Sequence, residues 1–261
     1  MGILNVTPDS FADGGLYLDP GAAEAAAVEM EARGADIIDV GGESTRPGSD
    51  TISPEDEIAR VRPVIMRLSG TVKIPISIDT SKPAVAEMAI AEGAALINDV
   101  TALRYDASLA EIAARTGAGL ILMHARGRSR DMYKEANYTS VSQEVTDELR
   151  SSLERALDAG APCESIVLDP GLGFAKRPEH SYAALAALPA IAGLGRPVLV
   201  GPSRKSFLTA AIGDRATGER DMATAASVAA SVLLGAHIVR VHNVPAMVDV
   251  VRVADAIRQQ W

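Results

Sequence analysis

Short apolar runs alternate with helix-like segments along the whole chain, and this alternation limits the possible folds more than any other feature. Eight of the runs have the Val-, Ile- and Leu-rich composition of short buried strands. They cover residues 2–6, 36–40, 74–78, 95–98, 119–123, 165–168, 197–200 and 237–241. Segments with helical spacing cover residues 22–33, 54–68, 84–92, 108–115, 141–159, 181–192, 206–211, 222–234 and 245–259. The pattern predicts an α/β protein with a parallel sheet.

A weak internal repeat closes several of these helices. The pairs that stand between a helix and the next strand are Gly34-Ala35, Gly93-Ala94, Gly117-Ala118, Gly160-Ala161 and Gly235-Ala236. Glycine there suits a left-handed helix cap, and alanine lets the strand enter close against its helix. Eight such units predict a (β/α)8 TIM barrel formed by a single domain, residues 1–261. A doubly wound open sheet would give the same alternation, but no strand is followed by the GxGxxG fingerprint of an open dinucleotide fold.

The composition disfavours several kinds of partner. The formal charge of −9 argues against nucleic acid or an anionic membrane surface, because both require a basic face on the protein. The one cysteine, Cys163, can form neither an internal disulfide nor a zinc cluster, which favours a reducing, cytoplasmic location. The sequence shows no signal peptide and no apolar run near the ~20 residues that span a bilayer.

In a barrel of this kind, functional residues lie at the C-terminal ends of the strands, and polar residues follow the predicted strands. Taken one at a time, most of them have an ordinary structural explanation. Asp79 alone is best explained as a cap of the next helix, Asn98 as a turn residue and Met123 as a core residue. Hydrogen-bonded positions at the rim suit His124 and His242. A solvated loop face explains Arg126, Arg128 and Arg130.

Together, the strand ends predict a binding site. Asp79, Asn98 and Asp169 would place two carboxylates and a carboxamide low in the barrel mouth, which suits a flat heterocycle with an amino-pyrimidinone edge. Cationic or protonatable side chains from other strands would surround the same mouth, and these are Arg46, Lys205, Arg240 and His242. In a chain of net charge −9, they predict a phosphate or diphosphate site.

Other chemistries have less support in the sequence. Neither a Ser-His-Asp order nor a pair of glutamates stands out, so hydrolysis by a triad is disfavoured. No set of residues predicts a tight metal site formed by the protein alone. Asn5 could bind Mg²⁺ only together with substrate oxygens and water, which is the usual coordination of this ion.

Eight motifs, in chain order, resemble the motif series of the dihydropteroate synthase family. They are ILNVTPDSF, VGGESTRPG, ISIDTSKP, LINDV, LILMH, LDPGLGF, VGPSRKS and IVRVH, and they extend over nearly the whole chain. The family is a pterin-binding (β/α)8 barrel, a transferase of folate biosynthesis. It joins 6-hydroxymethyl-7,8-dihydropterin diphosphate to 4-aminobenzoate and yields 7,8-dihydropteroate and diphosphate. The resemblance therefore implies this activity, with Mg²⁺ as cofactor.

The resemblance also implies roles for individual residues. The pterin site would comprise Asp79, Asn98, Met123, Asp169, Phe174, Gly201, Lys205 and Arg240. The diphosphate site would comprise Asn5, Thr45, Arg46, Arg240 and His242, with Asn5 also meeting the Mg²⁺. The aminobenzoate site would comprise Phe11, Thr45, Pro47, Lys205 and Ser206. The catalytic residues would be Arg46, Lys205, Arg240 and His242.

The implied reaction begins with loss of diphosphate and continues with attack of the arylamine on a cationic methylene group. Such a reaction needs no strong general base, which agrees with the absence of an obvious one. Two alternatives stay open. A pterin- or folate-dependent methyltransferase would share the barrel but has no reason to carry TRPG and SRKS. A paralogue could bind pterin without turnover.

Further expectations follow from the resemblance. The family is usually a homodimer packed through late helices, for which residues 223–234 and 245–259 could supply the contact face. The intact ESTRPG motif predicts sensitivity to sulfonamides, which occupy the aminobenzoate site in this family. The chain departs from the family pattern at Asn243, where an aspartate often stands, and in the loop that begins MHARGRSRDM. Family members also commonly have further residues before the first barrel strand.

Overall fold

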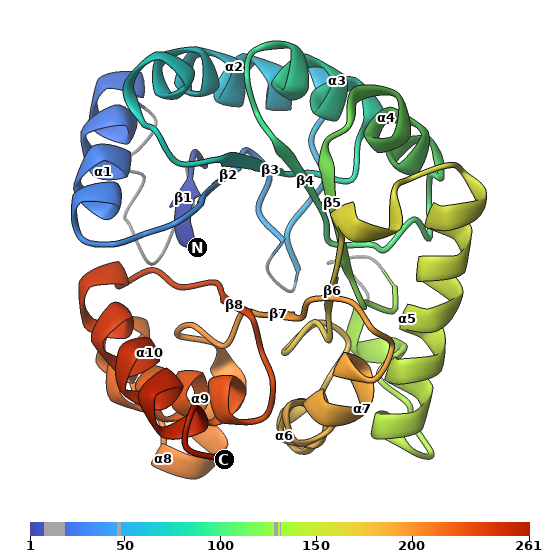
Figure 1. Ribbon diagram of the computed structural model, residues 1–261, viewed down its shortest axis with the longest axis vertical. Helices are drawn as coiled ribbons and strands as arrows, with labels where there is room; N and C mark the ends of the chain where they lie inside the picture. The colour runs from blue at the N-terminus through green and yellow to red at the C-terminus, as the bar shows by residue number, and fades with distance from the viewer. Residues whose placement is uncertain (8–18, 46–47, 128–129, 131) are drawn as a thin grey trace.

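The strands close into a parallel barrel. The computed structural model describes residues 1–7, 19–45, 48–127, 130 and 132–261. Six strands pair in parallel in chain order: β1 (Gly2–Asn5), β2 (Ile38–Gly41), β3 (Ile76–Asp79), β4 (Leu96–Asp99), β5 (Gly119–Met123) and β6 (Ile166–Asp169). A second parallel pair is formed by β7 (Leu199–Val200) and β8 (Ile238–Val239). Bridges from Gly2 to Val241 and from Leu168 to Val198 join this pair to both edges of the larger sheet. The predicted (β/α)8 barrel is therefore confirmed (Figure 1).

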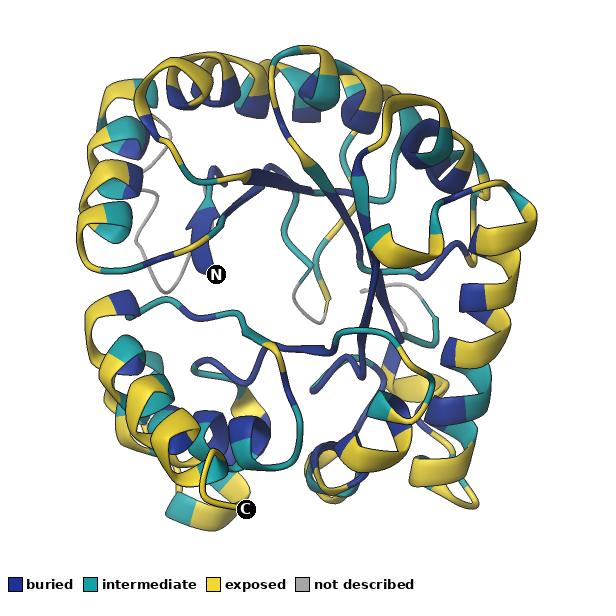
Figure 2. Ribbon diagram, in the orientation of Figure 1, coloured by how far each residue is buried: buried dark blue, intermediate teal, exposed yellow. Residues whose placement is uncertain are grey.

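Helices surround the barrel, and their buried residues face it (Figure 2). They are α1 (Pro20–Ala32), α2 (Pro54–Thr71), α3 (Pro83–Ala91), α4 (Ser108–Thr116), α5 (Val141–Asp158), α6 (Pro178–Ala186), α7 (Leu188–Ala192), α8 (Thr209–Ile212), α9 (Asp221–Leu233) and α10 (Val244–Arg258). The connections contain the 3-10 turns η1 (Met132–Lys134), η2 (Cys163–Ser165), η3 (Ser206–Leu208) and η4 (Thr217–Arg220). Among the described residues, no helix is both long and apolar enough to cross a membrane.

Two predicted helices differ from those observed. Residues 181–192 form two helices, because α6 ends at Ala186 and α7 carries Pro189 in its first turn. Proline has no N–H to donate to the preceding turn and clashes with its carbonyl, so one continuous helix is disfavoured there. Residues 206–211 fall in η3 and α8 instead of a single helix.

The repeated glycine–alanine pairs close their helices as predicted. The five glycines, at positions 34, 93, 117, 160 and 235, have φ angles between 74° and 112°. A β-carbon is strained in this backbone region, so glycine is the favoured residue. The alanine after each glycine is buried, which allows the next strand to start close against the helix.

The barrel interior contains an apolar layer with a more polar layer above it. Met1, Ile121, Val167 and Leu199 form a small separate cluster, against which Ile37, Leu96 and Ile238 pack. Because side chains alternate along a strand, residues two positions further on point to the same side. At these positions stand Ile3, Asp39, Asn98, Met123, Asp169, Gly201 and Arg240. Strand periodicity thus gathers most of the predicted pterin-site residues directly above the apolar layer.

Candidate functional site

A cavity of about 490 Å³ opens at the C-terminal ends of the strands. Its walls include residues predicted for all three substrate sites, namely Asn5, Thr45, Asp79, Phe174, Lys205, Ser206, Arg240 and His242. Four further predicted residues, Asn98, Met123, Asp169 and Gly201, are buried in the polar layer of the barrel and are not part of these walls. The predicted residues Phe11, Arg46 and Pro47 lie outside the described residues.

Arg240 is the central cation at the base of this cavity. It follows β8, and its guanidinium donates from Nε to Asp39 Oδ2 (2.6 Å) and from an Nη atom to Asp79 Oδ2 (2.9 Å). The same oxygen of Asp39 accepts a hydrogen bond from Asn98 Nδ2 at 3.1 Å. Asp39 is fully buried in β2 and was not among the predicted site residues. A carboxylate in the middle of an apolar run was the available signal, since such a charge is normally buried only with a partner.

Asp79 does not cap a helix, so that single-residue interpretation is wrong. The residue at the N-terminal cap of α3 is Lys82, and it forms no side-chain capping bond. The Asp79 carboxylate instead pairs with Arg240 inside the barrel. Burial raises the pKa of Asp79, the Arg240 charge opposes this rise, and the nearby Asp39 carboxylate adds to it. Asn98, likewise, is a buried partner of Asp39 instead of a turn residue.

Lys205 forms a second cationic centre, next to Asp169. Its Nζ donates to the carbonyl oxygen of Leu172 and lies 4.6 Å from the centroid of the Phe174 ring. Burial lowers the pKa of Lys205 to about 8, although the Asp169 carboxylate acts in the opposite direction. Asp169 accepts a hydrogen bond from the Gly171 backbone at 2.7 Å, and burial raises its pKa. The two groups next to Lys205, an aromatic ring and a carboxylate, are typical of a site that binds a flat polar heterocycle.

His242 lies at the cavity wall and is fixed by Ser203. The hydroxyl oxygen of Ser203 lies 2.9 Å from His242 Nδ1 and accepts the His242 backbone N–H at 3.1 Å. The next residue, Asn243, caps α10 and donates to Asp221, which also forms a two-point ion pair with Arg204. The strand ends of β7 and β8 are therefore tied to the start of α9. Asn243, which departs from the family pattern, therefore has a structural role, because its side chain links the end of β8 to the start of α9.

A partly buried lysine anchors the loop that follows β2. Lys82 Nζ lies 2.5 Å from Glu43 Oε2 and also donates to Glu57, whose side chain is buried. Glu43 in turn accepts the Ile52 backbone N–H at 3.0 Å. These contacts fix both ends of the segment that brings Thr45 to the cavity wall. Sequence reasoning missed the two glutamates because their partner stands on another unit of the barrel.

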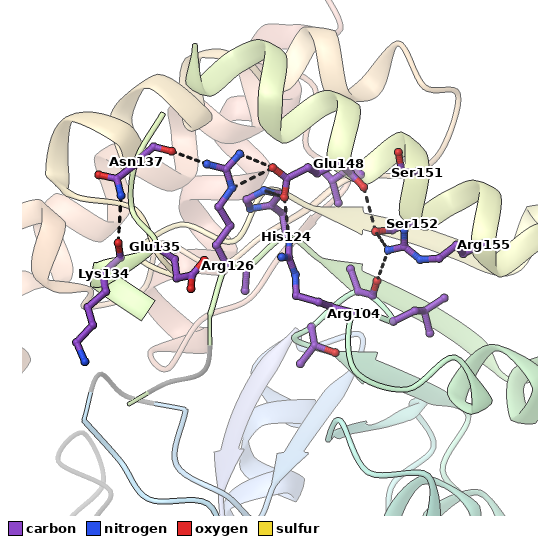
Figure 3. Close-up of a pocket in the computed structure, with 15 residues that line it drawn as sticks. Arg104, His124, Arg126, Lys134, Glu135, Asn137, Glu148, Ser151, Ser152 and Arg155 are labelled. Atoms are coloured by element: carbon purple, nitrogen blue, oxygen red, sulfur yellow. Dashed lines mark hydrogen bonds and ion pairs between the residues drawn. The ribbon is translucent and has the colours of Figure 1, made fainter. Parts of the chain in front are cut away.

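A larger hollow of about 900 Å³ lies beside the barrel mouth, and Figure 3 shows its charged lining. Arg126 there pairs with Glu144 and Glu148 and lies 4.1 Å over the Tyr138 ring, with only 15% of its side chain exposed. Its prediction as a solvated residue is therefore wrong. Of the strand-end residues named in the sequence analysis that the structure describes, only His124 borders this hollow, and it is buried. The substrate-site motifs converge on the smaller cavity instead.

The comparisons with known proteins agree with this geometry. The sequence matches the model of the pterin-binding enzyme family over residues 1–242. The chain belongs to the pterin-binding enzyme family. A dihydropteroate synthase from Synechocystis sp. is 42% identical over 257 residues, which cover 98% of this chain and 89% of that relative.

Solved structures of this family superpose over nearly the whole chain. Yersinia pestis dihydropteroate synthase in a sulfonamide drug complex has a TM-score of 0.95 and 37% identity, and the match covers 99% of this chain and 94% of that one. Xanthomonas albilineans dihydropteroate synthase with 4-aminobenzoic acid has a TM-score of 0.91 and 39% identity, and covers 99% and 92% of the two chains. The predicted membership of this family is confirmed.

Proposed function

We propose that this chain is a dihydropteroate synthase, which condenses 6-hydroxymethyl-7,8-dihydropterin diphosphate with 4-aminobenzoate. The observation that carries the proposal is the pairing of Arg240 with Asp39 and Asp79 at the base of the strand-end cavity. Asn98 and Asp169 stand in the same polar layer. Relatives of this chain at 42% identity and near-complete coverage carry the name of this enzyme, a transferase.

In this proposal the base of the cavity holds the pterin. The ring N–H and amino groups would donate to the carboxylates of Asp79 and Asp169, and the Asn98 amide would both donate and accept. Phe174 and Lys205 would both border the pterin ring, because they lie next to each other at the cavity wall. The buried Met123 and Gly201 would shape the floor.

The reaction breaks the bond between the pterin methylene carbon and the diphosphate oxygen, and the electron pair leaves with diphosphate. The arylamine nitrogen then forms a bond to that carbon and loses one proton to water. Carboxylates held beside the pterin stabilise the positive charge that develops on it. Arg240, His242 and Thr45 at the cavity wall would contact the departing diphosphate. Lys205 and Ser206 would lie near the aminobenzoate, with the predicted Arg46, Phe11 and Pro47 completing these sites.

The test is diphosphate release by the purified protein with the pterin diphosphate and Mg²⁺, with and without 4-aminobenzoate. Release coupled to formation of 7,8-dihydropteroate is expected, and a sulfonamide should raise the apparent KM for 4-aminobenzoate. Tight pterin binding without product would indicate a paralogue that binds without turnover. Methyl transfer from a methylated pterin to a corrinoid protein would indicate the methyltransferase alternative.

Mg²⁺ would be held mainly by the substrate. The described residues contain no group of three or more His, Cys, Asp or Glu side chains arranged for a metal ion. Asn5 offers one amide oxygen at the cavity wall, so its chemistry fits an ion that keeps diphosphate oxygens and water as its other ligands. When bound, Mg²⁺ would neutralise charge on the leaving diphosphate.

Asn5→Ala is expected to raise the Mg²⁺ concentration needed for half-maximal binding of the pterin diphosphate by about tenfold, the loss of one ligand contact. Calorimetric titration at several Mg²⁺ concentrations measures this shift without turnover. Binding of the pterin that lacks the diphosphate should stay unchanged, which serves as the internal control. Equal Mg²⁺ dependence in the variant and the parent protein would remove Asn5 from the metal site.

We also propose that the protein is a homodimer that packs through its last two long helices. α9 and α10 and the residues beside them expose large apolar side chains, namely Met222, Val253, Ile257 and Trp261. Exposed apolar groups of this size favour burial against a second copy. Sedimentation velocity should give a dimer mass, and a Met222→Asp, Val253→Asp double variant should give a monomer. An unchanged mass in the variant would place the contact elsewhere.

We further propose that residues 1–261 act as one domain in the cytoplasm on small-molecule substrates. The closed ring of strands draws on both ends of the chain, since Val241 pairs with Gly2. The single cysteine, Cys163, cannot form an internal disulfide, so the chain does not need an oxidising compartment in order to fold.

A further inference from the structure

A lysine beside the pterin pocket is buried without any role in the function described so far. Lys176 follows the motif DPGLGF, and only 1% of it is exposed. Its Nζ lies 2.7 Å from His124 Nδ1, 3.3 Å from the His124 carbonyl oxygen and 3.2 Å from the Phe174 carbonyl oxygen. These three acceptors match the three hydrogens of an ammonium group. A buried lysine is costly, so this arrangement requires an explanation.

The segment that Lys176 holds, residues 170–175, has three positive φ angles, one of them at a residue with a side chain. Gly171, Gly173 and Ala175 have φ angles of 65°, 80° and 48°. The left-handed region is strained for a residue with a side chain, as at Ala175, whereas glycine adopts it freely. The segment also packs tightly on the end of β5, because a β-carbon on Gly171 would lie 1.9 Å from the His124 carbonyl oxygen. Such a conformation persists only where the surrounding contacts enforce it.

The same segment is held from the cavity side by Lys205. Lys205 donates to the Leu172 carbonyl and lies over the ring of Phe174, while Lys176 donates to the Phe174 carbonyl. Two lysines therefore contact Phe174, Lys205 at its ring and Lys176 at its backbone carbonyl. We expect loss of the Lys176 contact to weaken the Lys205 contacts as well, because both lysines bind one short segment.

The partner of Lys176 lies against a carboxylate of α5. His124 Nε2 lies 3.2 Å from Glu148 Oε2, and Arg126 and Arg104 bind the same carboxylate (Figure 3). Burial and the neighbouring Lys176 charge lower the pKa of His124 to about 4, so the ring is neutral and its Nδ1 can accept from Lys176. Burial also lowers the pKa of Lys176, with Asp169 opposing. An amine and an ammonium both have enough hydrogens for the two carbonyls.

We propose that Lys176 is a positioning residue for pterin binding, which fixes residues 170–175 and, through them, Phe174 and Lys205 without touching the substrate. The inference rests on the proposed function only in taking the pterin diphosphate as the ligand of the cavity. A purely structural lysine would support the fold alone. The two roles differ in whether pterin affinity changes at a temperature where the variant is fully folded.

The first test is Lys176→Met, which keeps an unbranched apolar side chain and removes the donors. The Kd for the pterin diphosphate, measured by calorimetry with Mg²⁺ present, should rise about tenfold or more. In the kinetic assay the loss should fall mainly on KM for the pterin diphosphate and less on kcat. The control is Leu68→Ala, in a fully buried position near the end of α2, which should lower the midpoint of thermal unfolding and leave the pterin Kd unchanged.

A pair of His124 variants tests the same contact if Lys176→Met does not fold. Asparagine can present an oxygen near the position of Nδ1, whereas glutamine presents its polar group near the position of Nε2. We therefore expect His124→Asn to retain pterin affinity and His124→Gln to lose it. A pterin Kd within twofold of the parent value for Lys176→Met, or equal Kd values for the two His124 variants, would overturn the inference. If the parent protein binds pterin but forms no dihydropteroate, only the proposed activity fails.

Discussion

Arg240→Met is expected to lower kcat/KM for the pterin diphosphate by about 10²–10³-fold and the free energy of unfolding by about 3–5 kcal/mol. The reason is the pair of ion pairs at the base of the cavity, in which one guanidinium balances Asp39 and Asp79. Removing it leaves two carboxylates in the barrel interior without their cation. Burial already raises the pKa of Asp79, and without Arg240 its pKa should rise further. A protonated Asp79 accepts hydrogen bonds from the pterin less well.

Chemical denaturation measures the stability change, and steady-state kinetics at neutral pH measures the activity. The matched control is Arg33→Met, since Arg33 also pairs with a carboxylate, Glu29, but at the exposed C-terminal end of α1. This variant should differ little from the parent protein in either measurement, because exposed ion pairs are screened by water. Stability and activity of Arg240→Met close to those of the control would show that the buried pair has no such role.

The fold was predictable because its signals are local. Each strand is a short branched apolar run, and each helix of the glycine–alanine repeat ends at a residue that requires a positive φ angle. Periodicity within a strand also predicts which residues share the barrel interior. The errors were local as well: the break between α6 and α7 depends on where Pro189 falls in the first turn of α7.

The sequence predicted which residues belong to the site, but not which of them contact one another. Strand ends converge in a barrel, so residues such as Asp79 and Lys205 could be assigned to one cavity from their positions alone. Their partners could not be assigned, because Arg240 and Asp39 are 201 residues apart and nothing local links them. For the same reason Asp79 resembled a helix cap and Arg126 resembled a solvated residue, although each has a carboxylate or guanidinium partner on another element. Single-residue interpretations fail where the decisive contact is long-range.

The second large effect is expected at Lys205. Lys205→Met should weaken binding of the pterin diphosphate by about 10²-fold, because it removes the cation next to Asp169 and the donor to the Leu172 carbonyl. Lys205→Arg should bind pterin more tightly than Lys205→Met, since it keeps a permanent charge. Calorimetric titration of both variants gives the comparison. Equal affinity for the methionine and arginine variants would show that the charge of Lys205 does not matter.

The pH dependence separates this charge from the stability of the fold. Burial lowers the pKa of Lys205 to about 8, so kcat/KM for the pterin diphosphate should fall as the pH rises through about 8. In the unfolded chain the lysine has its ordinary pKa of about 10.4. Between these two values the unfolded state binds more protons than the folded state, so the contribution of Lys205 to folding stability rises with pH.

Activity and this stability term should therefore move in opposite directions above pH 8. Lys205→Arg should lose the fall in kcat/KM, because a guanidinium stays protonated throughout this range. Thermal unfolding gives the free energy of unfolding of the parent protein and of Lys205→Met across the same pH range. The difference between the two proteins is the contribution of Lys205. If the parent protein loses activity only where it also unfolds, or if Lys205→Arg keeps the fall in activity, then deprotonation of Lys205 is not the cause.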